Sequence, residues 1–138
     1  MPAKDIYHDT VKNALIKDGW TITDDPLRLQ VGIHRMFVDL GAQKLIAAEK
    51  GEQKIAVEIK SFISKSEIDD LENALGQYVL YEKVLAKNEP ERKIFLAVRE
   101  SVYVSIFEAE IGKMLLEDNE LSLLVFNERS EEVSKWIN

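Results

Sequence analysis

The chain has 138 residues, no cysteine and a formal net charge of -7 at pH 7. This length fits one domain with an ordinary hydrophobic core. The lack of cysteine excludes disulfides, thiolate nucleophiles and cysteine-type zinc sites, so any metal must be bound by oxygen, which favours Mg²⁺ or Mn²⁺. No apolar run approaches the roughly 20 residues that span a bilayer, and the first residues do not begin a signal peptide. We therefore expect a cytoplasmic protein without a membrane segment.

The negative charge argues against a protein that coats DNA non-specifically, because Lys and Arg drive affinity for phosphate. The charge is uneven: residues 1–66 carry 10 Lys/Arg against 9 Asp/Glu, while residues 67–138 carry 8 against 16. An acidic C-terminal half fits a solvated surface, repulsion of nucleic acid or a basic partner, and composition leaves these alternatives open.

In the first third of the chain, the sequence pattern predicts one helix. Residues 4–18 place Tyr7, Val11, Ala14 and Leu15 on one helical stripe, and Gly19 is a typical C-terminal stop. Two following extended pieces, residues 20–24 and 28–33, are too short or too polar to assign, and Pro26 separates them.

Strands are expected from Arg35 to Lys60. Interruptions at Gly41 and at Gly51 divide this stretch into a three-stranded meander. Asp39 is then near the end of the first strand, and Glu58 is near the end of the third.

A long helix should follow. Ser64 and Glu67 have capping-box spacing, and the helix should end near Lys87 because Pro90 bars its continuation. Glu82 falls inside the apolar stripe of this helix, which predicts a buried or interfacial carboxylate. The stripe consists of Ile68, Leu71, Leu75, Tyr78 and Leu85.

The remaining elements complete an α/β pattern. Residues 92–99 predict a strand buried on both faces, and residues 101–118 a helix broken near 110–112. Residues 121–126 and 133–137 predict two further strands. The whole chain, residues 1–138, is expected to form a single α/β domain with a mixed central sheet flanked by helices.

The pattern Glu58-Ile59-Lys60, with Asp39 nineteen residues upstream, predicts a site. Alternate strand residues share a face, so Glu58 and Lys60 point together, and Asp39 joins them from a neighbouring strand. Two carboxylates beside an ammonium group can hold a divalent metal and activate water against a phosphodiester. Simpler interpretations remain open: Asp39 capping a turn, and Glu58 pairing with Lys60 at a solvated edge. Glu49 could add a carboxylate, although its position near a turn favours a solvated charge.

This pattern resembles the PD-(D/E)XK nuclease superfamily, although Val38 stands where the superfamily has its proline. Gln77 and Tyr81 resemble the Gln-x-x-x-Tyr element of RecB-like members, and four-residue spacing puts them side by side on a helix. The resemblance implies that Asp39 and Glu58 bind the metal, that Lys60 assists catalysis, and that Gln77 and Tyr81 contact substrate. His8 lies on the first helix, where many superfamily members carry an acidic residue, and is a further candidate for substrate binding. For these last three residues, ordinary packing is the alternative.

A second resemblance covers nearly the whole chain. Several segments are similar to the XisH family, a cyanobacterial group named for controlling excision of the fdxN element. It implies a restriction-endonuclease-like fold, XisI-type partner proteins and a role in programmed DNA excision. The segments are residues 8–15, 18–20, 38–42, 45–50 and 55–62.

Two functions of different classes follow. One is a metal-dependent DNA endonuclease using Asp39, Glu58 and Lys60 with Mg²⁺ or Mn²⁺. The other is a non-catalytic accessory factor that keeps the nuclease-like fold and binds an XisI-type partner. Either one is expected to be at least a homodimer, because a small acidic domain offers little surface for a DNA duplex.

Overall fold

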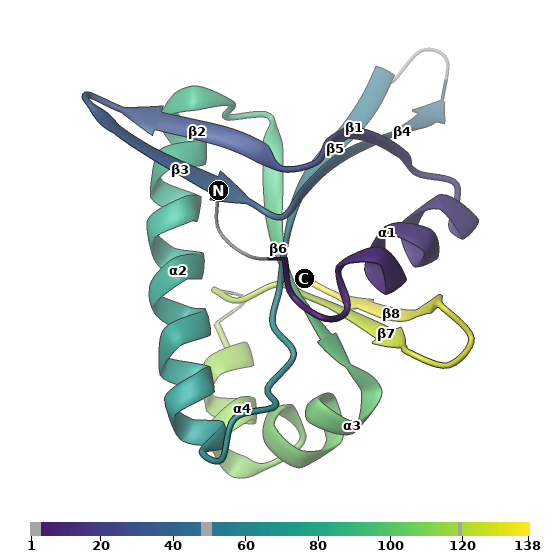
Figure 1. Cartoon of the computed structure of the whole chain (residues 1–138), viewed down its shortest axis with the longest axis vertical. Helices are drawn as coiled ribbons and strands as arrows, with labels where there is room; N and C mark the ends of the chain where they lie inside the picture. Colours follow the sequence, from purple (N-terminus) through teal and green to yellow (C-terminus); the bar gives the residue numbers. More distant parts are fainter. Residues whose placement is uncertain (1–3, 48–50, 119) are drawn as a thin grey trace.

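The computed structural model describes residues 4–47, 51–118 and 120–138. A six-stranded mixed sheet runs through the molecule in the order β1-β4-β5-β6-β7-β8 (Figure 1). The parallel strands β5, β6 and β7 form its centre, and the outer pairs are antiparallel. The strand that carries Glu58 is therefore interior, as expected. The strands are β1 (Thr21–Asp24), β4 (Leu40–Ala47), β5 (Gly51–Ile59), β6 (Arg92–Arg99), β7 (Leu123–Asn127) and β8 (Glu132–Ile137).

A separate hairpin corrects the expected meander. Strands β2 (Leu27–Val31) and β3 (His34–Val38) pair only with each other among the described residues, so only β4 and β5 form the predicted consecutive pair. The chain bends at Asp39 rather than at Gly41. Gly41 instead lies within β4, where an added Cβ would stand 3.0 Å from atoms of Arg92 and Asp24. Glycine marks a close approach of side chains here rather than a turn.

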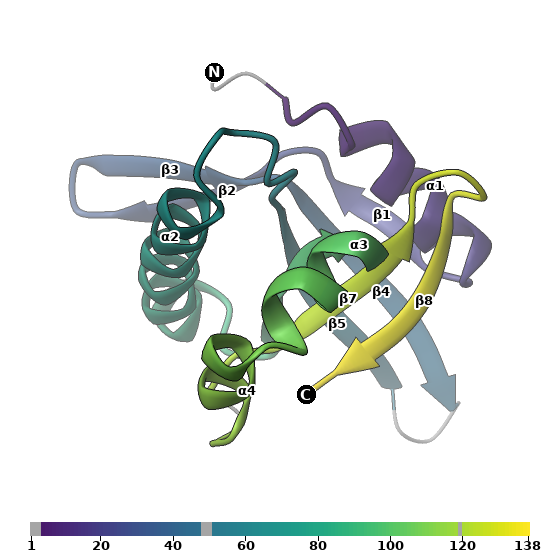
Figure 2. The same cartoon turned by 90° about the horizontal axis from the view of Figure 1, so that it is seen from below.

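Helices cover both faces of the sheet (Figure 2). Helix α1 (His8–Lys17) packs on one face, and α2 (Glu67–Asn88) packs on the other. Strand β6 is buried on both faces, as predicted: Leu96 faces the core under α2, whereas Phe95 and Ala97 face the core under α1. The segment after β6 contains α3 (Glu100–Val102), a π-helical turn (Tyr103–Phe107) and α4 (Glu110–Leu116). No helix among the described residues combines the length and apolarity needed to cross a bilayer.

The long helix is present, but two details of its prediction are wrong. Ser66, not Ser64, is its N-cap, since the Ser66 hydroxyl accepts a hydrogen bond of 3.1 Å from the Asp69 N–H. The buried face is also rotated: Ile68 is 51% exposed and Glu82 is exposed. The helix buries a face at spacings of three and four residues toward β6 and the hairpin. Its apolar members are Leu71, Ala74, Tyr78, Tyr81, Val84 and Leu85.

The break in the following helical segment falls at residues 108–109, slightly before the predicted position. Gly112 belongs to α4, where an added Cβ would lie 2.2 Å from the Ile106 carbonyl oxygen. The glycine is therefore required by the close packing of α4 on the preceding turn and does not interrupt the helix.

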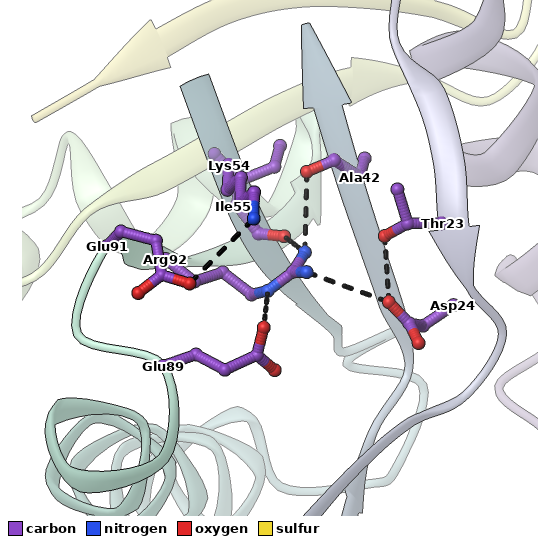
Figure 3. Close-up of polar contacts among 8 residues, drawn as sticks. All are labelled: Thr23, Asp24, Ala42, Lys54, Ile55, Glu89, Glu91 and Arg92. Carbon is purple, nitrogen blue, oxygen red and sulfur yellow. Dashed lines mark hydrogen bonds and ion pairs between the residues drawn. The ribbon is translucent and has the colours of Figure 1, made fainter. Parts of the chain in front are cut away.

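A buried arginine joins four strands and the end of α2 (Figure 3). Arg92 begins β6 and donates to the Ile55 carbonyl oxygen at 2.8 Å and to the Ala42 carbonyl oxygen at 3.5 Å. Its guanidinium also lies 3.2 Å from Glu89 and 3.7 Å from Asp24. Several donors of one planar cation thus satisfy carbonyl groups within β4 and β5, at the point where β6 begins.

We expect Arg92→Ala to destabilise the protein by about 2 to 4 kcal/mol, because it leaves two carbonyl groups and two carboxylates without their shared partner. Urea unfolding measures this difference. Exposed Arg129→Ala is the matched control and should change stability by less than about 0.5 kcal/mol. Equal effects of both substitutions would contradict a structural role for the Arg92 contacts.

Candidate functional site

A cavity of about 180 Å³ lies where the end of β5 meets the bend between β3 and β4, with α2 as its other wall. Side chains from four separate stretches of the sequence meet there. The lining residues are Asp5, Phe37, Asp39, Glu58, Ile59, Lys60, Gln77 and Tyr81. Five of the six predicted site residues therefore surround one cavity, and His8 is the exception.

Main-chain hydrogen bonds place the two central carboxyl groups. Asp39 occupies the bend after β3, and its Oδ2 accepts a hydrogen bond of 2.7 Å from the Ile59 N–H. The Asp39 N–H in turn donates to Glu58 Oε1 at 3.4 Å. The two carboxyl groups are close enough for a hydrogen bond between them to affect both pKa values. The side-by-side placement that the sequence pattern required is thus built from reciprocal contacts across two strands.

Burial and the closeness of the two carboxylate charges favour the protonated, neutral forms of Asp39 and Glu58. Burial, followed by the charge of Asp39, raises the pKa of Glu58 to about 9, against the opposing effect of Lys60. Burial also raises the pKa of Asp39, although the Ile59 N–H and the nearby His8 oppose it. Two close carboxyl groups titrate as a unit and share a proton. Without a cation, the pair therefore holds a proton at neutral pH, mainly on Glu58.

The other lining side chains supply hydrogen-bond donors. Burial, and then the charges of Glu58 and Asp39, raise the pKa of Tyr81 to about 12, so its hydroxyl stays protonated. Gln77 is exposed one turn earlier on the same side of α2. Lys60 follows β5 and is fixed by its main-chain N–H, which donates to the Ala97 carbonyl oxygen at 3.1 Å. An ammonium, a phenol and an amide thus face the two carboxyl groups.

Asp5 is a third acidic residue at the cavity, and the sequence pattern did not reveal it. Its Oδ2 accepts a hydrogen bond of 3.1 Å from the Ser61 N–H, and its Oδ1 accepts one of 2.9 Å from the Tyr7 N–H. The carboxylate therefore ties the segment before α1 to the residue after Lys60. The resemblance to the PD-(D/E)XK superfamily offered a signal, an acidic position on the first helix, but it directed attention to His8.

His8 lies near Asp39 but does not line the cavity. Its ring is buried, and Nε2 is 2.6 Å from Asp25 Oδ1, while Lys12 Nζ is 2.8 Å from Asp25 Oδ2. Burial raises the pKa of the Asp25 carboxyl group. Hydrogen bonds from Lys12 and His8 outweigh this effect, so the pKa of Asp25 is lowered overall. His8 thus fastens α1 to the loop before β2 and does not join the cavity lining. Its expected contact with substrate therefore stays a prediction.

The donor set fits a hard divalent cation. Asp39 and Glu58 offer carboxylate oxygens, and a cation between them would relieve their repulsion. Within the described residues, no group of three or more His, Asp or Glu side chains is placed to hold a metal. A cation bound by Asp39 and Glu58 would therefore take other ligands from water or phosphate, as Mg²⁺ commonly does. Glu49, considered above as a further carboxylate, lies outside the described residues.

The pKa of Glu58 predicts how stability depends on pH. Between about pH 4.5 and pH 9 the folded protein keeps a proton that the unfolded chain has released, so stability falls as pH rises through this window. Glu58→Gln removes this dependence. We expect it to gain roughly 2 to 4 kcal/mol over the wild type between pH 5 and pH 9, measured by urea unfolding in buffers without metal.

Exposed Glu82→Gln is the matched control, because it makes the same substitution on the surface of α2. Its stability profile should run parallel to that of the wild type. A parallel profile for Glu58→Gln as well would show that Glu58 is ionised throughout this range and would contradict the expected protonation.

Comparison with known proteins assigns the chain to a family. Residues 1–134 match the family model described as XisH protein. An XisH family protein from Nostoc punctiforme PCC 73102 is 37% identical, with a TM-score of 0.87 over 97% of this chain and 100% of that one. A fdxN element excision controlling factor protein from Anabaena variabilis is 40% identical, with a TM-score of 0.87 over 98% of this chain and 100% of that one. No curated protein matches. The chain therefore belongs to the XisH family.

Proposed function

We propose that this protein is a metal-dependent DNA endonuclease of the PD-(D/E)XK type, with a restriction-endonuclease-like fold, that acts in programmed excision of a DNA element. The observation that carries the proposal is the single cavity lined by Asp39, Glu58 and Lys60. The relative from Anabaena variabilis, described as an excision controlling factor, supports DNA excision as the process.

Each residue has a distinct part in the proposed reaction. Asp39 and Glu58 hold Mg²⁺ or Mn²⁺, and the Ile59 N–H keeps Asp39 oriented through its 2.7 Å hydrogen bond. Magnesium, when bound, supplies positive charge that stabilises the phosphoryl oxygens and favours ionisation of water. Lys60 places its ammonium beside the attacked phosphate, where it stabilises developing negative charge. The protonated Tyr81 hydroxyl and the Gln77 amide donate hydrogen bonds to the DNA backbone.

A non-catalytic accessory role is the second candidate, and one observation favours it. The oxygens of both carboxyl groups accept main-chain hydrogen bonds that join the bend at Asp39 to β5. Such bonds give the acidic residues a purely structural use. In this case the protein contributes to excision by binding an XisI-type partner, and the cavity catalyses no reaction.

Cleavage assays separate the two candidates. Purified protein, alone and then with an XisI-type partner, is incubated with labelled single-stranded, duplex and branched DNA while Mg²⁺ or Mn²⁺ is titrated. The nuclease proposal predicts that some substrate is cut only with metal. Asp39→Asn, Glu58→Gln and Lys60→Met should each slow cutting at least about 100-fold. Exposed Glu82→Gln and Lys83→Met should cut like the wild type. Absence of cutting in all conditions, with partner binding intact in every variant, would establish the accessory role instead.

Calorimetry tests the cation site without any substrate. The wild type should bind Mg²⁺ or Mn²⁺ with release of a proton, because the cation displaces the proton shared by Asp39 and Glu58. Glu58→Gln should lose this binding, whereas Glu82→Gln should keep it. Titration in two buffers of different ionisation enthalpy measures the released proton, and binding without proton release would contradict the shared proton.

The proposed assembly is at least a homodimer, since one small acidic domain has little surface with which to hold a duplex. Sedimentation of the purified protein should show dimers that dissociate on dilution. A monomer at every concentration would leave the XisI-type partner as the source of the missing DNA contacts.

A further inference from the structure

The β2–β3 hairpin forms its own two-stranded sheet, separate from the six-stranded one. In both views it crosses α2, and its tip projects beyond the helix (Figures 1 and 2). Ile33 at the tip is 90% exposed, and Val31 beside it is 40% exposed. Gly32 forms the turn with φ of 59°, a left-handed conformation that glycine adopts without strain. The Ile33 side chain at the tip therefore contributes little to the packing of the hydrophobic core.

One face of the hairpin is basic and leads to the cavity. Direct pairing of Arg28 with Phe37, and of Gln30 with Arg35, puts these four side chains on the same face. Phe37 also lines the cavity beside Asp39. Arg35 is four residues before Asp39, or about 13 Å along an extended chain. The sugar-phosphate backbone of a DNA strand lying along this face would reach the carboxyl groups of Asp39 and Glu58.

The charge of this hairpin is opposite to that of the whole chain. Residues 26–38 contain Arg28, His34 and Arg35 and no Asp or Glu, although the protein carries a net charge of -7. Arg92 and Arg99 form ion pairs with carboxylates, whereas neither Arg28 nor Arg35 lies within ion-pair distance of one in the described residues. Their charges therefore remain available for an external anion.

The ribbon is also held in place. Asn88, at the end of α2, accepts a hydrogen bond of 3.0 Å from the Gln30 N–H and donates one of 3.1 Å to the Gln30 carbonyl oxygen. The opposite face buries Leu27, Leu29 and Val38 in the core under α2. Arg28 Nη2 further donates to Gln30 Oε1 at 3.0 Å. The basic face is thus presented on a supported element, which reduces the ordering cost of binding.

We propose that the β2–β3 hairpin is a DNA-binding arm that enters the major groove of a duplex and directs one strand into the cavity. The major groove is about 12 Å wide and admits a two-stranded ribbon. Arg28 and Arg35 contact phosphates, and Ile33 makes apolar contact with base edges in the groove. The inference rests on the proposed action on DNA, but it concerns binding and not cleavage.

Fluorescence anisotropy with a labelled DNA duplex in EDTA tests the arm without any catalytic step. The double variant Arg28→Ala, Arg35→Ala should bind at least about tenfold more weakly than the wild type. Its slope of log affinity against log salt should be smaller by about 2, since two phosphate contacts are lost. Ile33→Ser should weaken binding severalfold and keep the wild-type salt slope. Circular dichroism and thermal unfolding establish that each variant is folded.

The matched control removes two exposed cations elsewhere, Lys113→Ala on α4 and Arg129→Ala in the turn after β7. It should bind DNA like the wild type. Equal weakening in the control and the hairpin variant would overturn the arm, because only general charge would then matter. A wild type that binds no duplex at low salt would overturn it too. Hairpin variants that bind normally while the wild type cuts DNA would refute the arm and leave the nuclease proposal standing.

Discussion

The hydrogen bond from the Ile59 N–H to the Asp39 carboxylate is the contact on which the arrangement depends. It fixes the bend that ends β3 and begins β4, and so determines where the hairpin leaves the sheet. It also brings Asp39 beside Glu58 at the end of a central strand. One short contact therefore couples the direction of the hairpin to the geometry of the carboxyl pair. Loss of the Asp39 side chain would disturb both at once, which is why charge-neutral Asn is the more informative substitution.

The elements that the sequence predicted well are those set by local pattern. Strand β6 has a continuous apolar middle, and the extent of α2 follows from a serine near its start and a proline limit, although its buried face differs from the predicted stripe. The alternation of Glu58 and Lys60 followed directly from strand geometry, so their common orientation needed no tertiary information. Gln77 and Tyr81 could likewise be placed together from their helical spacing. The last two inferences involve residues within four positions of one another, and the first two involve patterns within a single element.

Three further differences depend on contacts between residues far apart in the sequence. Gly41 was interpreted as a turn, but Arg92, fifty-one positions later, needs the space that its missing Cβ leaves. Asp5 was missed because its relation to the cavity depends on the Ser61 N–H, fifty-six positions away. His8 occupies a plausible helical position, yet Asp25 engages it instead. A sequence pattern shows which residues can share a face, whereas distant partners decide which side chains are free for a site.

An acidic protein can still engage DNA when its charges are separated in space. Net charge governs long-range attraction, which is screened beyond about 8 Å at physiological salt, whereas contact with phosphate depends on the nearest cations. On this chain Arg28 and Arg35, which form no ion pair among the described residues, lie on the exposed face of the hairpin, opposite the face that packs on α2. If the proposed cation site exists, the carboxyl pair would add a second control, because a cation would have to replace the proton that the pair holds. Since protein oxygens provide only part of the coordination shell, a DNA phosphate would complete it and raise cation affinity. Cation and DNA would then bind cooperatively, by the reciprocity that links any two ligands sharing one site.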